Sequence, residues 1–370
     1  MKNRTLKKLS FIFIVPAVFL TFLYSFFCIS CGGRNNLRGA NSAEIIGSAA
    51  GDSATFSLGR IRFDMRFVPG GLTIPVSDSD YGIYFDTVDK GYWIADTEVT
   101  YELWKAVYDW AVSPERAGGA YTFANKGRQG ADASPGSRPV GTKQHPVTNV
   151  SWRDAMIWCN ALTERFNAET GARLECVYFK DKDFMVPLRS VDSSDDYPCD
   201  TTPGTQDNPY VNENADGFRL PAKNEWILAA RYRGEDSVNT EERFSHPYFT
   251  KSNSASGAVA GVRNRKATGD VAWYYDNSGG STKPVGTAGI GGKKPGKGNA
   301  NALGLYDMSG NVSELSFDWF KEHELGYCFR TSHSGSWAGF AELQKIRIRM
   351  NIFPYAANNF TGFRFARTQK

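Results

Sequence analysis

Residues 301–312 read Asn-Ala-Leu-Gly-Leu-Tyr-Asp-Met-Ser-Gly-Asn-Val, and this stretch does more than any other to indicate the fold. Asp307 and Asn311 are placed where their side chains can stabilise a tight turn by hydrogen bonding to the backbone. With 37 glycines and 16 prolines, the chain predicts many such turns and irregular loops. No internal repeat at a fixed period stands out, which argues against a solenoid or propeller. Residues 61–367 are therefore interpreted as a few helices among short strands and long loops.

Three helices are predicted upstream of this stretch from capping residues and from apolar residues at helical spacing. Thr100 can cap the first helix, and Ser151 can cap the second as part of a capping box. Gly171 ends the second helix. Pro221 is tolerated in the first turn of the third helix, which ends at Gly234.

The quoted stretch resembles the Gly-Asn-Val turn of the sulfatase-modifying-factor family, which is built around the formylglycine-generating enzyme. The other matches, in family order, are residues 91–100 with Trp104, 145–152 with 154–155 and 158–159, 218–221 with 225–226 and 229–231, 284–286, 335–337, Arg347, Arg349, Pro354 and 362–364. Together they cover nearly all of residues 61–368. The resemblance implies an α+β, C-type-lectin-like fold with few helices, short antiparallel strands and much irregular structure.

One departure from the family concerns its catalytic metal. Formylglycine-generating enzymes carry a cysteine pair shortly after the Gly-Ser-aromatic turn, and its soft thiolates hold copper. The aligned positions here are Gly339 and Gln344, and no cysteine follows Cys328. The resemblance therefore implies a non-catalytic member, with no copper and no catalytic residue.

Other chemistry is only weakly indicated. The four histidines include no pair at the i, i+4 spacing of a helical zinc site, and each is interpreted as structural or solvated. A catalytic site made of a thiol and a histidine that the fold brings together is left open by the sequence. The alternative function is therefore an enzyme or maturation factor of the same superfamily with different chemistry.

A second departure concerns calcium. In the family, the Gly-Asn-Val turn and the Trp-Glu-Trp that follows it bind calcium through oxygen ligands, and here that tripeptide is Ser-Glu-Leu at 313–315. Carried over position by position, the implied ligands are Asp307, the Gly310 carbonyl, the Val312 carbonyl and Glu314, a donor set that suits a hard cation. The alternative is that Asp307 and Asn311 only stabilise the turn. Structural calcium is the expectation.

The closing segment, residues 338–361, is predicted to bind a ligand. Residues 346–349 and 362–365 alternate like half-buried strands, with an exposed loop around Pro354 between them. Aromatic residues beside adaptable asparagines on a rigid scaffold are typical of binding surfaces. The candidate contacts are Phe340, Glu342, Gln344, Asn351, Phe353, Tyr355, Asn358, Asn359 and Phe360.

The flanking aromatics of this segment, Trp337, Phe363 and Phe365, are assigned to the core. Within the family, retroelement-diversified variable proteins, including spirochaetal lipoproteins, place a hypervariable surface between a Gly-Ser-Trp turn and a terminal Gly-Phe-Arg. This chain has the same two flanks. The resemblance therefore implies a protein or glycan ligand.

The first 30 residues have a basic start and an apolar stretch, which predicts a secretory signal peptide. Cys31 follows Ile-Ser and resembles the acylated cysteine of a bacterial lipoprotein. The alternative is an uncleaved membrane helix. Residues 31–59, rich in Gly, Asn, Ser and Ala, are predicted to be a flexible tether to a domain at 60–370. The expected location is the cell envelope, with the outer membrane or cell surface favoured over the inner membrane.

The formal net charge of +4 comes from four basic residues in the predicted signal peptide, and 39 basic and 39 acidic side chains remain after it. That balance gives no general attraction to nucleic acid. The four later cysteines are Cys159, Cys176, Cys199 and Cys328, and their pairing cannot be deduced. Cys159 lies on an apolar helix face, so a buried thiol and a disulfide are equally compatible with it.

Overall fold

The structure is a computed structural model that describes residues 36–37, 45–79, 82–116, 118–140, 144–195, 200–289, 294–320 and 328–370. The chain divides into two units, Met1–Gly33 and Arg34–Lys370, and every described residue belongs to the second. The predicted signal peptide, Cys31 and Cys199 lie outside the described residues. Among the residues that the structure describes, no helix is both long enough and apolar enough to cross a membrane.

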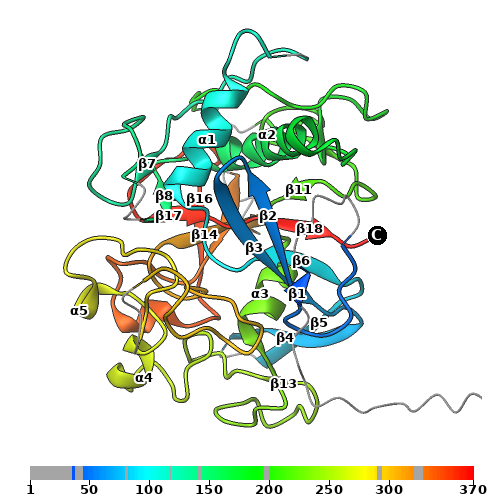
Figure 1. The fold of residues 1–370 in the computed structure, drawn as a ribbon. Coiled ribbons are helices and arrows are strands. Elements are labelled where there is room, and N and C mark those ends of the chain that lie inside the picture. The colour runs from blue at the N-terminus through cyan, green and yellow to red at the C-terminus, as the bar shows by residue number, and fades with distance from the viewer. Residues whose placement is uncertain are drawn as a thin grey trace, which may run out of the picture. The chain divides into compact units, whose positions relative to one another are not determined.

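A six-stranded sheet joins the beginning and the end of the domain (Figure 1). Its strands, in spatial order, are β1 (Asn36–Leu37), β2 (Ser53–Leu58), β3 (Ile61–Val68), β6 (Tyr92–Ala95), β18 (Ala366–Thr368) and β11 (Phe218–Arg219). Strands β1 and β2 pair in parallel, and the other neighbours pair antiparallel. The predicted tether boundary at residue 59 is therefore wrong, because β2 is an integral strand with buried Phe56 and Leu58.

A four-stranded sheet carries the family turn and the closing segment. Its strands, in spatial order, are β16 (Arg349–Ile352), β15 (Phe329–His333), β14 (Ser313–Phe320) and β17 (Thr361–Phe363). Strands β14 and β17 are parallel, and the other pairs are antiparallel. The strand predicted at 346–349 is thus displaced, beginning only at Arg349. Four two-stranded pairs complete the strands: β4 (Leu72–Ser79) with β5 (Gly82–Val88), β7 (Arg128–Gln129) with β8 (Val147–Thr148), β9 (Tyr178–Phe179) with β10 (Tyr210–Val211), and β12 (Tyr232–Gly234) with β13 (Tyr248–Phe249).

The predicted helices are present as α1 (Tyr101–Ala111), α2 (Trp152–Thr170) and α3 (Lys223–Arg231). Thr100 caps α1. Ser151 and Asp154 form a capping box at the start of α2, and this helix ends at left-handed Gly171. The predicted end of the third helix at Gly234 is wrong, because the chain leaves α3 at Tyr232 and enters β12. The short helices α4 (Arg265–Gly269) and α5 (Tyr275–Ser278) and a 3₁₀ turn (Ala341–Gln344) were not predicted.

Both faces of the six-stranded sheet are covered, as the alternation along β6 shows. Trp93 and Ala95 belong to a core cluster shared with α1 and α2, whereas Tyr92 and Ile94 belong to a second cluster around α3. Figure 1 shows α1 and α2 on one side of this sheet and α3 on the other.

Trp158 of α2 lies at the centre of the larger cluster. Its ring centroid is 5.8 Å from that of Trp104, 5.4 Å from that of Phe363 and 5.9 Å from that of Phe365. Phe363 and Phe365 are fully buried, as predicted. The C-terminal strands are therefore held by the main core, and they fix the C-terminal end of the closing segment.

Candidate binding surface

The closing segment presents two different kinds of surface. Phe340, Glu342, Asn351 and Phe360 are exposed, as expected of ligand contacts. Another four of the candidates are half-buried, namely Phe353, Tyr355, Asn358 and Asn359. The ninth, Gln344, is completely buried.

Gln344 was therefore wrongly predicted as a ligand contact. Its Nε2 donates to the carbonyl of Phe340 at 3.1 Å and to that of Gly339 at 3.3 Å, so the side chain holds the turn from inside. A Cβ at Gly335 would collide with this amide, and the glycine makes room for it. The two positions aligned with the copper-binding cysteines are thus a glycine and a structural amide, and neither offers the soft sulfur that copper requires.

The most exposed apolar feature of the segment is the aromatic patch, which consists of Tyr275, Phe340 and Leu343. Their side chains are 59%, 58% and 38% exposed. The rings of Tyr275 and Phe340 lie 5.2 Å apart at 59°. The Tyr275 backbone N–H donates to the Gly339 carbonyl at 2.9 Å, which joins α5 to the closing segment.

A polar rim borders the aromatic patch. Arg265 of α4 lies 3.2 Å from Glu342 and 3.7 Å from Asp276, and all three side chains are about half exposed. A hydrogen bond from the Glu342 backbone N–H, together with Arg265, lowers the pKa of the Glu342 carboxyl. The rim therefore carries fixed charges of both signs at neutral pH. Rigid aromatics inside a charged rim are the usual anatomy of a protein-binding hot spot.

Sequence reasoning missed Tyr275, Leu343 and Arg265 as parts of this surface. Tyr275 and Arg265 precede Phe340 by more than 60 residues in the chain, and they lie in helices of only four and five residues. Such short helices give no apolar periodicity to detect. Leu343 lies within the closing segment between the selected residues Glu342 and Gln344, but it was not itself selected.

The second half of the segment is supported by the start of α2. Phe353 and Tyr355 stack at 5.2 Å and 16°, and Phe353 also contacts Phe329 at 4.6 Å. The Arg153 guanidinium lies 5.8 Å from the Tyr355 ring, and the backbone N–H of Arg153 donates to the carbonyl of Pro354. Pro354 is buried, so the loop predicted to be exposed around it is anchored instead.

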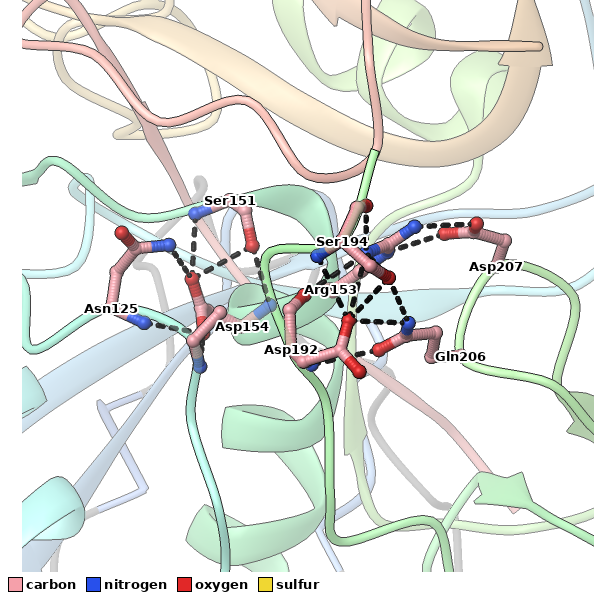
Figure 2. Close-up of polar contacts among 9 residues, drawn as sticks. Asn125, Ser151, Arg153, Asp154, Asp192, Ser194, Gln206 and Asp207 are labelled. Atoms are coloured by element: carbon pink, nitrogen blue, oxygen red, sulfur yellow. Dashed lines mark hydrogen bonds and ion pairs between the residues drawn. The ribbon is translucent and has the colours of Figure 1, made fainter. Parts of the chain in front are cut away.

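Arg153 belongs to the polar network drawn in Figure 2. It donates to both carboxylate oxygens of Asp207, at 2.6 and 2.7 Å, and to the carbonyls of Asp192 and Ser194 at 2.9 Å. Hydrogen bonds from Ser194 and then from Gln206 lower the pKa of Asp192 to about 2. The network is therefore charged and fully formed at neutral pH, which fixes the support beneath Tyr355.

Trp337 joins the two halves of the segment. It is half-buried rather than a core residue, and its indole N–H donates to the Asn359 carbonyl at 2.9 Å. Its own carbonyl accepts from the Ser278 hydroxyl at the end of α5. Asn358 accepts the Phe360 N–H through its side chain and the Asn149 N–H through its carbonyl. These bonds leave the outer edge, Phe360 and Asn351, accessible to a ligand.

The two carboxylates among the four predicted calcium ligands, Asp307 and Glu314, differ in whether their oxygens are already hydrogen-bonded. Both Glu314 oxygens accept from the buried guanidinium of Arg364, and one also accepts from the Trp226 indole at 2.7 Å. Asp307 accepts from the Gly286 N–H with one oxygen, and its other oxygen is buried without a hydrogen bond. Of the two carboxylates, Asp307 therefore fits a calcium ligand, and Glu314 is already paired.

Two of the carboxyl groups around the turn have raised pKa values, which matters for binding a cation. Burial raises the pKa of Asp307 to about 6, and burial together with Asp307 and Glu314 raises the pKa of Glu98 well above its usual value. Asn311, at φ 55°, donates to Glu98 at 2.7 Å, which also agrees with a purely structural turn. In the described part of the chain, no three His, Cys, Asp or Glu side chains come together as a metal-binding group. Calcium stays a prediction.

The cysteines give little support to thiol chemistry. Cys159 and Cys176 are free and buried, and burial raises the pKa of both thiols well above the usual value. Cys328 is in a disulfide. A nucleophilic cysteine requires a stabilised thiolate, which burial at these two positions disfavours.

Comparison with known proteins identifies the fold. The family model of the sulfatase-modifying factor enzyme 1-like domain matches residues 64–369. The structure of Treponema denticola variable protein 1 is 26% identical with a TM-score of 0.57, over 85% of this chain and 99% of that one. The structure of CarF is 25% identical with a TM-score of 0.53, over 83% and 99%. The predicted α+β fold of the C-type-lectin-like type is therefore confirmed.

One further relative is the chaperone protein LppX of Paenibacillus barcinonensis. It is 30% identical over 215 residues, which are 57% of this chain. The match spans 66% of the relative's own length, just under two thirds.

Proposed function

Because this chain belongs to the family of sulfatase-modifying factor enzyme 1-like domains, we propose that it is a non-catalytic member that binds a ligand at the bacterial cell envelope. The ligand is a protein or a glycan, and it contacts the aromatic patch together with Glu342, Asn351 and Phe360. Acylated Cys31 attaches the domain to the outer membrane or cell surface.

The aromatic patch is the observation that carries this proposal. Two aromatic rings and a leucine are exposed to solvent on short elements that a backbone hydrogen bond joins. Exposed aromatics on a rigid support lose little conformational entropy on binding, which is why interfaces favour them. The similarity to a protein named a variable protein also supports a binding role, including diversification of residues 338–361.

Non-catalytic status rests on the donor set. The positions of the copper thiolates are Gly339 and Gln344, and the free thiols Cys159 and Cys176 are buried. The envelope location is supported by the similarity to LppX and by the predicted processing site at Cys31. The balanced charge of the mature chain agrees with a partner other than nucleic acid.

Replacing Tyr275 or Phe340 with alanine is expected to weaken ligand binding about 30-fold or more, the effect of losing a hot-spot side chain of about 2 kcal/mol. A glycan array and a panel of purified extracellular proteins first identify a ligand for the full chain. Titration of that ligand then compares the variants. Val238→Ala is the matched control, because it also removes an exposed apolar side chain. Unchanged affinity in both patch variants, at unchanged unfolding temperature, would place the site elsewhere.

The alternative is a maturation factor or enzyme with different chemistry, and it is favoured by one observation, the chaperone name of the LppX relative. A chaperone would raise the yield of an active client protein when the two are co-expressed. Turnover of a cysteine-containing peptide with copper and oxygen would contradict the non-catalytic assignment directly.

Calcium at the family turn is part of the proposal. Calcium at millimolar concentration is expected to raise the unfolding temperature by several degrees, because binding to the native state alone stabilises it. Asp307→Asn is expected to remove that increase, since it removes the buried carboxylate oxygen that has no hydrogen bond. Magnesium serves as the control ion. If calcium stabilises the Asp307→Asn variant as much as the parent, the turn is not its site.

A further inference from the structure

The loop after β9 carries three consecutive apolar residues into solvent, far along the chain from the aromatic patch. Phe184, Met185 and Val186 are 38%, 77% and 50% exposed. Runs of exposed apolar residues are avoided on soluble domains unless they have a function, because they promote aggregation. Residues 184–186 are called the apolar tip below.

The apolar tip is held in place by one carboxylate. Asp181 accepts the backbone N–H groups of Asp183 at 3.1 Å, Met185 at 3.0 Å and Val186 at 2.7 Å. The Lys180 N–H also donates to the Val186 carbonyl at 2.9 Å, which closes the loop. The exposure of the apolar tip is thus built into the loop by specific hydrogen bonds.

The backbone of Phe184 is also held in an unusual conformation. Its φ is +57°, a left-handed conformation that is uncommon for a bulky residue and that persists only where surrounding contacts enforce it. Its ring lies 5.4 Å from that of Phe179, so one side of the ring is supported and the other faces outward. A tip that is already ordered pays no ordering entropy when it docks.

The side chains beside the apolar tip suit a lipid surface as its occupant. Residues 180–183 carry two lysines and two aspartates and so have no net charge, but Lys180 and Lys182 are exposed whereas the Asp181 carboxylate accepts from three N–H groups of the loop. Apolar side chains that enter the acyl boundary, with lysine ammonium groups at the phosphates, match the interfacial region of a bilayer. A protein partner would need a hole shaped for three adjacent side chains.

We infer that the apolar tip inserts into the surface of the bilayer to which this chain is anchored. The inference rests on the proposed function for that anchor. Asn36, paired with β2, is five residues after Cys31, so an acyl group at Cys31 is attached at most about 18 Å along the chain from the sheet. The domain is thereby kept close to the membrane, and the apolar tip is a second, non-covalent contact with it.

The test uses the full chain, matured and reconstituted in vesicles of phosphatidylethanolamine and phosphatidylglycerol. A Met185→Cys variant carries an environment-sensitive nitrobenzoxadiazole label, and Val259→Cys is the control, at a valine that is also largely exposed. The label at position 185 is expected to shift to the blue and to be quenched several-fold by doxyl lipids, with no change at position 259. In a separate variant, Met185→Glu is expected to lower the vesicle partition of an unacylated Cys31→Ala chain about tenfold or more.

The outcomes separate the two proposals. If the measured mass of the mature protein includes no acyl chains, the lipid anchor of the proposed function is contradicted, and so is an insertion that depends on that anchor. An acylated chain whose label at 185 stays as solvent-exposed as that at 259 contradicts the insertion alone. Shielding that depends on protein concentration, and not on lipid, would assign the apolar tip to contact with a second copy.

Discussion

Replacing Arg364 with methionine is expected to lower the free energy of unfolding by about 3–5 kcal/mol, because it leaves a buried carboxylate without its partner. Arg364 and Glu314 are 0% and 1% exposed, and the guanidinium donates to both carboxylate oxygens. Its remaining hydrogen bonds go to the carbonyls of Ala95 and Tyr306. One side chain therefore links the six-stranded sheet, the four-stranded sheet and the family turn.

Urea unfolding at pH 7 measures this loss through the transition midpoint at constant slope. Lys105→Met is the control, because Lys105 and exposed Asp109 form an i, i+4 pair on α1 whose removal costs at most about 0.5 kcal/mol. Adding Glu314→Gln to the Arg364 variant is expected to recover part of the loss, since it removes the unpaired charge. A cost below about 1 kcal/mol for Arg364→Met alone would mean that water reaches this carboxylate.

The helices could be predicted where their signal is local. Thr100 and Ser151 cap the helices that they were expected to cap, because a cap is a hydrogen bond between residues two or three positions apart. Gly234 misled the prediction of the third helix end. There the chain turns at Tyr232 to pair with β13, and that pairing depends on Tyr248 and Phe249, which lie beyond the local window of a helix end.

The start of the domain was misplaced for a compositional reason. Residues 32–59 are rich in Gly, Ser and Ala, which favoured a tether, yet Ala54, Phe56 and Leu58 alternate as a strand with one buried face. The period-two signal was present in six residues of this stretch.

The candidate surface was predictable in part. The family turn and the two flanks of the closing segment were identified from sequence, and Phe340 and Phe360 are exposed as expected. Gln344 was misassigned because a polar side chain on a loop is usually solvated, whereas this one finds three carbonyls inside its own turn. Tyr275 could not have been paired with Phe340, because their contact arises only when α5 docks on the Gly339 carbonyl.

Arg153, which supports the second half of the closing segment, is the site of the other prediction with a large effect on stability. Replacing Arg153 with methionine is expected to cost about 3–5 kcal/mol of stability, because Asp207 is 2% exposed and would lose both of its guanidinium hydrogen bonds. The same change removes the contact to the Tyr355 ring. It also removes the bonds to the carbonyls of Asp192 and Ser194, which Figure 2 shows converging on Arg153. Stability and the order of the binding segment should therefore fall together.

Hydrogen exchange separates that local loosening from global unfolding. In Arg153→Met, the amides of residues 355–360 are expected to exchange faster by more than the loss of global stability explains, and ligand affinity should fall with them. Arg364→Met, of similar global cost, is the matched comparison, because the Arg364 hydrogen bonds go to Glu314, Ala95 and Tyr306 and not to the closing segment, so the excess exchange should be absent. Adding Asp207→Asn to Arg153→Met removes the unpaired charge and should restore stability without restoring the order of the segment. Recovery of both would mean that the charge, and not the guanidinium beneath Tyr355, positions the surface.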